Sequence, residues 1–507
     1  MLSPRSFAVS TLLTAALAVP AVAQVQGPSS SQTPYVLPTA PGAITKSILT
    51  VGDSVNLKPD GVTPYRMVGI PDGLGAFDNG DGTFTVLMNH ELGATSGVPR
   101  AHGSTGAFVS KWVIDKSTLA VLNGSDLTQT VQLWNGNGFT PGTTSFARFC
   151  SGDLPAVSAF FNATSGLGTT ARIYMNGEET GAEGRAFAHI VTGASAGTSY
   201  ELPYLGKFSW ENSLANPFAS DKTIVAGTDD SNGGQVYFYI GDKTNTGTEI
   251  DKAGLNGGNL YGISIAGITA ETNTTSIAPN TRFNLTNLGN VANTTGANLQ
   301  TQSVAAGVTA FLRPEDGLWN PLNPNEFYFA TTNAFNSPSR LWRLRFDNIA
   351  DPTLGGVVEM LLDGTEGQRM LDNLGIDKYG NILLQEDVGN NAHIGKIWQY
   401  NIATDTLTPI AQHDPSRFLS GGANFLTQDE ESSGIIDMED ILGPGWFLLD
   451  VQAHYPISGE LVEGGQLLAL YNPSTAAAAG VPEPSNVPMV FAGGLFMAGV
   501  WLKRRHR

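Results

Sequence analysis

Cys150 is the only cysteine among 507 residues, and it lies in the segment "ARFCSGDLP". One cysteine excludes an internal disulfide framework. Arg148 precedes the thiol and Asp153 follows it, within a turn of Gly and Ser. Nearby positive charge favours the thiolate, which is the form that binds metals. Cys150 is therefore a candidate metal ligand. The alternative is that it packs as a small hydrophobic side chain.

Hydrophobic runs along the chain repeatedly end in polar or acidic clusters. The clusters contain Asn89, His90 and Glu91; Glu178 and Glu179; Asp229 and Asp230; Thr332 and Asn333; Glu386 and Asp387; and Asp450 with His454. Carboxylates that gather in one place repel each other and raise each other's pKa. A hard cation removes that conflict. Calcium takes roughly six to eight oxygen ligands, and iron accepts a mixed shell of carboxylate and thiolate.

The elements that must position these clusters are short β-strands. Alternating runs bounded by Gly, Asn and Asp dominate between residues 40 and 475. The 60 glycines and the low share of charged residues, 14%, are typical of an exported all-β protein. About six weak copies of a strand with a polar end predict a β-propeller with six blades. The polar ends would then meet at one mouth of the central channel. The alternative is a pair of β-sandwiches with ordinary acidic turns.

The ends of the chain predict export. Residues 1–23 have a basic start, an apolar run and the small residues "AVA", as in a signal peptide. Residues 24–45 read as a linker, residues 46–475 as the propeller, and residues 472–485 as a second linker. The segment 476–507 contains "VPEP", an apolar run over 487–502 and the basic tail "KRRHR". The run is short for a transmembrane helix, and the basic tail fits the positive-inside rule.

This C-terminal tail resembles the PEP-CTERM sorting signal of Gram-negative bacteria that make extracellular polysaccharide. The resemblance implies a transient inner-membrane anchor and processing by a dedicated membrane protease. The mature protein would then lie in the periplasm, the outer envelope or the extracellular matrix. The net charge of −18 argues against nucleic acid or acidic lipid as partners. A monomer is expected.

Several islands of the central region resemble PhoX-type alkaline phosphatases. They are "MNHEL", "RFCSGDLP", "NGEE", "RPEDGLWNP" and "LGIDKYGNILLQEDVG", in the order of that family. The resemblance implies a β-propeller with a calcium–iron cluster that cleaves phosphate monoesters. It also implies roles for individual residues. Cys150 would bind iron; Glu315, one of Glu178 and Glu179, and Glu91 would bind metal; Glu386 or Asp387 is a further candidate ligand; Arg313 would hold phosphate oxygens, with Asn89 beside them.

One segment departs from the pattern of this family, and one residue has an alternative role. The family has a short link with a Trp between the cysteine and the paired glutamates. Here "DLPAVSAFFNATSGLGTTARIYMN" intervenes without a Trp, as an insertion expected beside the site that could alter substrate access. Arg313 could instead form a structural ion pair with Glu315 or Asp316.

The sequence thus favours an exported metal-dependent phosphatase that acts on small phosphate esters. The alternative is a non-catalytic, calcium-stabilised propeller that is retained at the envelope and binds extracellular polysaccharide. A third hypothesis is a hydrolase of lactones or phosphodiesters on the same ring. The chain has no Gly-x-Ser-x-Gly elbow with a supporting triad, which argues against serine hydrolysis. The propeller hypothesis places Glu179, Glu315 and Glu386 near one end of the channel.

Overall fold

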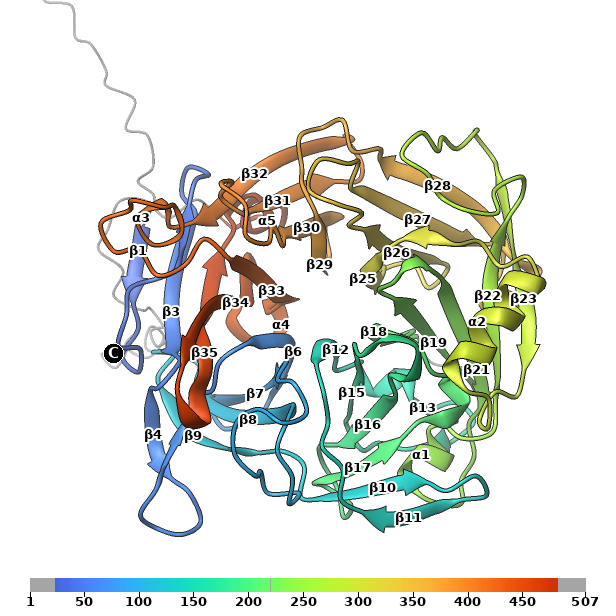
Figure 1. Ribbon diagram of the computed structural model, residues 1–507, viewed down its shortest axis with the longest axis horizontal. Helices are drawn as coiled ribbons and strands as arrows, with labels where there is room; N and C mark the ends of the chain where they lie inside the picture. Colours follow the sequence, from blue (N-terminus) through green and yellow to red (C-terminus); the bar gives the residue numbers. More distant parts are fainter. Residues whose placement is uncertain (1–22, 219, 482–507) are drawn as a thin grey trace, which may run out of the picture.

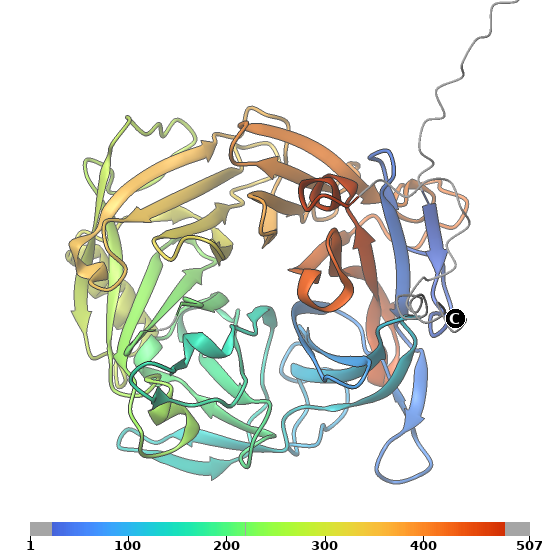
Figure 2. The ribbon, with the colours of Figure 1, turned by 180° about the vertical axis from the view of Figure 1, so that it is seen from behind.

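The computed structural model describes residues 23–218 and 220–481. Antiparallel sheets are arranged around a central axis, and one edge strand of each sheet unit lies beside that axis (Figure 1, Figure 2). The described chain is therefore all-β and propeller-like, as predicted. Within the described ranges, no helix is both long and apolar enough to cross a membrane. The predicted signal peptide and most of the predicted sorting segment lie outside the described residues, so both stay predictions.

Five sheets form the ring. From the axis outward, the first holds β6 (Pro71–Asp78), β7 (Thr83–His90), β8 (Phe108–Asp115) and β9 (Val121–Asp126). The second holds, in the same direction, β12 (Phe149–Asp153), β15 (Ile173–Glu178), β16 (Ala186–Ile190), β17 (Thr198–Glu201), β10 (Thr130–Trp134) and β11 (Phe139–Gly142).

The next sheet is continuous over nine strands and has an axial strand at each edge. It runs β18 (Trp210–Ala215), β19 (Lys222–Asp229), β21 (Val236–Asp242), β22 (Asn259–Ile265), β23 (Arg282–Gly289), β28 (Gly356–Leu362), β27 (Arg340–Phe346), β26 (Glu326–Thr331) and β25 (Pro314–Trp319). The pairing of β23 with β28 joins what would otherwise be two units. The blade count of six therefore stays a prediction.

The last two sheets contain strands from both ends of the chain. From the axis outward, one holds β29 (Leu371–Ile376), β30 (Asn381–Glu386), β31 (Lys396–Asn401), β32 (Thr406–His413) and β2 (Val36–Pro38). The other holds β33 (Glu430–Asp437), β34 (Trp446–Ile457), β35 (Val462–Tyr471), β3 (Ile44–Thr50) and β1 (Ala23–Gln26). The segment 24–45 is thus not a free linker, because β1 and β2 pair with β3 and β32. The pairing of β3 with β35 closes the ring.

The remaining elements are short and lie at the edges of the ring. They are the strand pairs β4 (Ser54–Leu57) with β5 (Pro64–Arg66), β13 (Phe161–Asn162) with β14 (Leu167–Gly168), and β20 (Asn232–Gly234) with β24 (Phe311–Leu312); the helices α1 (Glu249–Lys252), α2 (Gly296–Ala305), α3 (Pro415–Phe418), α4 (Glu439–Leu442) and α5 (Pro473–Ala478); and single 3-10 turns at Val157–Ala159, Gly181–Glu183, Pro203–Leu205, Pro352–Leu354 and Gly459–Leu461.

The core lies between neighbouring sheets, where large side chains fill the space that glycines leave open. Trp210 of β18 is 1% exposed and packs against β15 and β19. A Cβ atom at Gly177 or Gly227 would come within 2.3 or 2.7 Å of the Trp210 side chain. Gly177 is therefore required for the contact of Trp210 with the neighbouring sheet, and Gly227 for its packing within its own sheet. Close packing of this kind fixes the axial strands, and with them the polar side chains at their ends.

Candidate metal centre

The axial strands present a chemically similar side chain at the same position. In each case it is the second residue of the strand. These residues are Asp72 of β6, Cys150 of β12, Glu211 of β18, Glu315 of β25, Asp372 of β29 and Glu431 of β33. The register then shifts within two or three residues in each of these strands, which marks a local irregularity of the ladder. Bulges of this kind re-aim side chains near functional sites.

A second set of polar residues follows from the strand register. The first residue of each axial strand pairs with the neighbouring strand, and the residue after that partner is polar. Examples are Pro71 opposite His90, followed by Glu91, and Phe149 opposite Glu178, followed by Glu179. The full set is Glu91, Glu179, Asp230, Thr332, Asp387 and His454. Both sets therefore lie at the same end of their strands.

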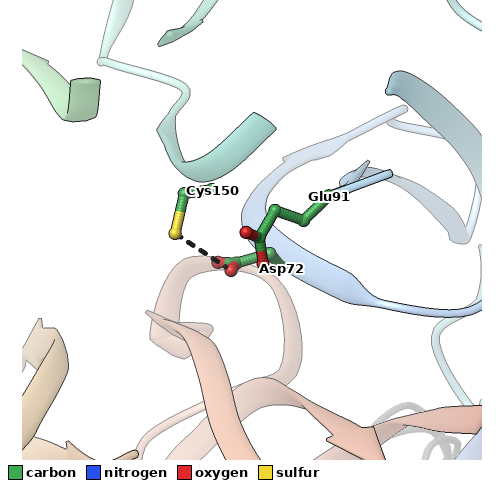
Figure 3. A group of neighbouring side chains, drawn as sticks. All are labelled: Asp72, Glu91 and Cys150. Carbon is green, nitrogen blue, oxygen red and sulfur yellow. Dashed lines mark hydrogen bonds between the residues drawn. The ribbon is translucent and has the colours of Figure 1, made fainter. Parts of the chain in front are cut away.

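Ligand atoms from the two sets form four overlapping groups, and within each group the atoms lie within 4.8 Å of one another. The groups are Asp72, Glu91 and Cys150; Cys150, Glu179 and Glu211; Glu211, Glu315 and Asp372; and Asp372, Asp387 and Glu431. Because Cys150, Glu211 and Asp372 are each shared, the groups join into one arc around the axis, which we call the acidic arc. Figure 3 shows Asp72, Glu91 and Cys150 pointing toward one another at one end of it.

Cys150 is buried, at 7% exposure, and lies beside Asp72 and Glu91. Its Sγ donates a hydrogen bond to Asp72 Oδ2 at 3.4 Å (Figure 3). Burial, and then the charges of Asp72 and Glu211, raise the pKa of the thiol well above its usual range. Arg148 interacts favourably with a thiolate at Cys150, but burial and the carboxylates outweigh that one cation and the pKa of the thiol rises. A metal cation in the arc would supply the missing positive charge.

The pKa values of carboxyl groups in the arc are raised as well. Burial and the charge of Glu91 raise the pKa of Glu179 to about 9. Burial and nearby acidic groups raise the pKa of Glu211 to about 8 and that of Asp387 to about 7. The pKa values of Glu315 and Asp372 rise well above their usual range for the same reasons. One oxygen of Asp372, Oδ1, also has no hydrogen-bond partner among the described residues. This oxygen-rich set with one sulfur fits bound cations.

Two arginines reach the arc from equivalent positions. Arg148 and Arg313 each lie one residue before an axial strand and have left-handed backbone angles, with φ of 46° and 61°. Such conformations cost free energy in non-glycine residues and are concentrated at functional sites. Arg148 Nη2 contacts Glu91 Oε1 at 2.8 Å and also pairs with Glu179. The Arg148 side chain remains 50% exposed, so its guanidinium lies at the mouth of the arc.

Arg313 forms a structural ion pair, which was the alternative to a phosphate-binding role. Its partners are Glu315, as expected, and Asp230 in place of Asp316. Its Nε and Nη2 donate to Asp230 Oδ1 and Oδ2 at 2.8 and 2.7 Å. Nη2 also lies 3.1 Å from Glu315 Oε1. Asp316 instead accepts hydrogen bonds from Asn212 and from the backbone. With 35% of its side chain exposed, Arg313 is paired but still accessible.

Two of the predicted ligands lie outside the arc, and in each case the next residue lies in it. Glu178 pairs with Arg185, whose Nε and Nη2 donate to its two oxygens at 2.7 Å each. Glu386 is 0% exposed and accepts hydrogen bonds from Trp398 Nε1 at 2.8 Å, from the backbone N–H of Lys396 in β31 and from the backbone N–H of Arg369 before β29. Both carboxylates hold the strands together. The arc instead contains Glu179 and Asp387; Glu386 lies at the same end of its strand, opposite Leu371, but its carboxylate is outside the arc.

Asn89 supports the arc from behind. Its Nδ2 donates to the carbonyl oxygens of Cys150 and Ser151, at 2.6 and 3.2 Å. Its Oδ1 accepts a hydrogen bond from Asn176 at 2.9 Å, and the residue is 0% exposed. Both ends of the amide are therefore occupied. In this structure Asn89 fixes the backbone of Cys150 and does not extend into open space where a phosphate could bind.

The middle of the predicted insertion lies away from the arc, whereas its last residue, Asn176 in β15, contacts Asn89. Strand β12 carries the chain away from Cys150, and the hairpin β13–β14 follows at the other end of the ring. There Ser158 Oγ donates to the carbonyl of Pro217, and Asn162 Nδ2 donates to Asp221 Oδ1 at 2.7 Å. Pro217 and Asp221 lie before β19, whose opposite end leads to Asp230. The expectation that the insertion lies beside the site is therefore wrong for the hairpin, whose contacts are with Pro217 and Asp221.

Sequence reasoning missed four members of the arc: Asp72, Glu211, Asp372 and Glu431. A signal for them exists in the axial strands. The six segments are "IPDGLG", "RFCSGDL", "SWENSL", "RPEDGL", "MLDNLG" and "DEESSGI". In five of them Pro, Phe, Trp or Leu precedes the acidic residue or thiol, and in all six a small or polar residue follows it. This shared pattern is only three residues long, and its residue types are also common in turns. It can therefore be recognised only when the six segments are aligned.

A family model, "Alkaline phosphatase PhoX", matches residues 195–361, about a third of the chain. The matched part contains Glu211, Arg313 and Glu315 but not Cys150. The fold is similar to that of Pseudomonas fluorescens PhoX, solved in complex with vanadate, a transition state analogue. The TM-score is 0.57 at 12% identity, covering 87% of this chain and 98% of that one. This likeness supports the fold.

Weaker similarities connect the chain with other solved structures. A Trypanosoma rangeli sialidase in complex with sialic acid has a TM-score of 0.34 at 10% identity, covering 85% of this chain and 59% of that one. The PQQ-bound aldose sugar dehydrogenase of Streptomyces coelicolor has a TM-score of 0.33 at 11% identity, covering 85% and 99%. Among curated protein sequences, none matches this chain.

Proposed function

We propose that this protein is a metal-dependent phosphatase that hydrolyses small phosphate esters at the acidic arc. One observation carries the proposal. Eight carboxylates and one thiol from separate strands converge at one end of the ring, with two accessible guanidinium groups beside them. The PhoX family match over residues 195–361 and the fold of the P. fluorescens enzyme support the same class of reaction.

The donor atoms fit calcium and iron. Carboxylates such as Glu211, Glu315 and Asp372 offer the oxygen atoms that calcium prefers. Cys150 offers a sulfur atom, which selects a softer metal, and we assign iron to that part of the arc. When bound, such cations would offset the negative charge of the transferring phosphoryl oxygens and activate the attacking water.

The arginines would bind and orient the substrate. The guanidinium of Arg313 uses its Nε and Nη2 to bind Asp230, which leaves Nη1 to bind phosphate oxygens. In the described structure it is held by Asp230 and Glu315, which fix its orientation before substrate arrives. Arg148 is held in the same way by Glu91 and Glu179. Two guanidinium groups on the rim would favour small, strongly anionic esters.

The test combines elemental analysis of the purified protein with turnover of p-nitrophenyl phosphate. We expect bound calcium and iron together with phosphatase activity. Arg313→Lys should lower kcat/KM by roughly 10- to 100-fold, since lysine cannot pair with Asp230 through two N–H groups and bind phosphate with a third. Arg282→Lys is the matched control, because Arg282 also forms a bidentate pair, with Asp347, but on the exposed surface.

Two results would contradict the proposal. A protein that binds neither metal would leave the carboxylates as structural residues. A metal-loaded protein without activity on p-nitrophenyl phosphate or other phosphate esters would instead favour the non-catalytic, calcium-stabilised ring. Equal losses in Arg313→Lys and Arg282→Lys would remove the assigned role of Arg313.

A further inference from the structure

Three basic residues are bound to one buried carboxylate, that of Glu386. Its Oε1 accepts hydrogen bonds from the backbone N–H of Arg369 and from Trp398 Nε1, both at 2.8 Å. Its Oε2 accepts from the backbone N–H of Lys396 at 3.0 Å and contacts His393 Nε2 at 3.1 Å. We call Arg369, His393 and Lys396 the basic cluster. Because all three are attached to the same carboxylate, they lie close together although they come from two separate segments.

The basic cluster lies at the end of the ring that holds the acidic arc. Arg369 is two residues before β29 and three before Asp372 of the arc. His393 and Lys396 follow Asp387 of the arc, and Lys396 is the first residue of β31. In the ring, β29 lies beside β25 (Figure 1). The cluster is therefore next to two ligands of the arc without being part of it.

A short loop connects the basic cluster with Arg313, the arginine assigned to the phosphate. The loop begins where the backbone N–H of Thr332 donates to the carbonyl of Arg313 at 3.1 Å. Three residues further, the carbonyl of Phe335 accepts a hydrogen bond from Arg369 Nη1 at 3.1 Å. The centroid of the Phe335 ring is 5.8 Å from that of the His393 ring and 5.7 Å from Arg369 Cζ. The phosphate site and the cluster are thus neighbours at the rim.

The two permanent cations of the cluster are not neutralised by carboxylates. Within the described chain, neither Arg369 nor Lys396 forms an ion pair, and both side chains are partly exposed. Lys396 Nζ lies 5.1 Å from the centroid of the Trp398 ring. By contrast, Arg148 and Arg313 each pair with two carboxylates. In a protein with a net charge of −18, two such cations beside the arc indicate a place for an anion.

His393 is oriented so that one of its ring nitrogens remains for a ligand. A carboxylate accepts hydrogen bonds and does not donate them, and Glu386 already accepts three other N–H groups. The contact with His393 therefore places the ring hydrogen on Nε2. Its Nδ1 has no hydrogen-bond partner among the described residues, and the side chain is 23% exposed. Nδ1 donates only in the charged ring, so an anion bound there would select that form.

We propose that the basic cluster binds a second anionic group, carried by the leaving group of the phosphate ester. The inference rests on the proposed function, in which the arc and Arg313 bind the phosphoryl group that is transferred. A carboxylate or a second phosphate on the leaving group would accept hydrogen bonds from Arg369 and His393, and Lys396 would add electrostatic attraction. The substrates would then be phosphate esters with two anionic groups.

The experiment compares three esters that share one ring: phenyl phosphate, para-carboxyphenyl phosphate and para-phenylene bisphosphate. The last two add a carboxylate or a phosphate to the leaving group. The measured quantity is kcat/KM of each of these two, divided by kcat/KM of phenyl phosphate. Arg369→Gln should lower this ratio by roughly 10-fold, as expected for the loss of one charge-assisted hydrogen bond. The ester whose ratio falls more identifies the oxyanion that the cluster fits.

Arg172→Gln is the matched control. Arg172 also lies over a phenylalanine ring, 4.9 Å from the centroid of Phe77, and forms no ion pair in the described part of the chain. It precedes β15, whose other end leads to Glu179, so it is at the opposite end of the ring. Its ratio should equal that of the wild type. Lys396→Gln should also lower the ratio, and it decides the question if circular dichroism shows that Arg369→Gln does not fold.

The outcomes separate this inference from the function on which it rests. If the esters are hydrolysed but the ratio is unchanged in the folded variants of the cluster, or falls equally in Arg172→Gln, the inference alone is overturned. A metal-loaded protein that hydrolyses none of the three esters would overturn the proposed function, and this inference with it.

Discussion

Replacing Glu211 with glutamine tests whether the acidic arc is in electrostatic conflict without cations. Glu211 is 1% exposed and belongs to two of the four groups. Ser151 Oγ donates a hydrogen bond to its Oε1 at 2.5 Å, which glutamine can also accept. Burial, together with the charges of Asp230 and Asp316, raises the pKa of Glu211 from 4.5 to about 8. The substitution removes the charge and keeps the shape.

The magnitude follows from the difference in pKa between the folded and unfolded states. The folded state binds the proton more tightly, so stability falls as pH rises from 4.5 to about 8. At about 1.4 kcal/mol per pKa unit, the full loss is on the order of 5 kcal/mol. It is absent below the unfolded pKa and complete above the folded one. Glutamine has no proton to release, so the metal-free variant should not show this loss.

The assay is urea unfolding in chelator, at about pH 5 and about pH 9. Between these values the free energy of unfolding of the wild type should fall by several kcal/mol more than that of Glu211→Gln. With calcium the order should reverse, because the variant lacks one ligand. Glu183→Gln is the control, since Glu183 is 55% exposed and outside the arc. If the free energy of unfolding depended on pH equally in the wild type and in Glu211→Gln, the reasoning that the metal-free arc is in electrostatic conflict would be refuted.

The remaining predictions concern which residues bind metal. Cys150→Ser should lower iron content and phosphatase activity together while circular dichroism shows an intact fold, and the native thiol should resist alkylation until metal is stripped. A thiol that reacts freely in the loaded protein would leave Cys150 as packing only. Asp387→Asn should lower bound metal with little change in Tm, whereas Glu386→Gln should lower Tm by breaking the contacts with Trp398 and the β31 backbone. The opposite pattern, measured by elemental analysis and thermal melts, would return the ligand role to Glu386.

The sequence predicted the class of fold, and it predicted the ligands that follow the strands next to the axial strands. Alternating runs with polar ends identified β7, β15 and β30, and so Glu91, Glu179 and Asp387 were candidates from the sequence alone. Neighbouring residues such as Glu178 and Glu179 could not be separated, because successive side chains of a strand point to opposite sides and the end of the strand decides between them.

The axial strands were harder to recognise. Asp72 in "IPDGLG" and Asp372 in "MLDNLG" lie among residues that are typical of turns. Their ligand partners are supplied by other units of the ring, and Glu431 joins them from the far end of the chain. Spacing along the sequence carries no information on such contacts. Among the axial residues, Cys150 was a candidate as the one cysteine of the chain, and only the resemblance to a known family drew attention to Glu315.

The spread of the donors along the chain has a consequence for biogenesis. The arc runs from Asp72 to Glu431, so no nascent fragment that ends before Glu431 holds a complete set of ligands. Contacts between residues this far apart form late, because the entropy of closing such long loops must be overcome first. Metal loading would then be the final step of maturation, after β3 has paired with β35. The ions that this protein acquires would be those present in the compartment where its two ends meet.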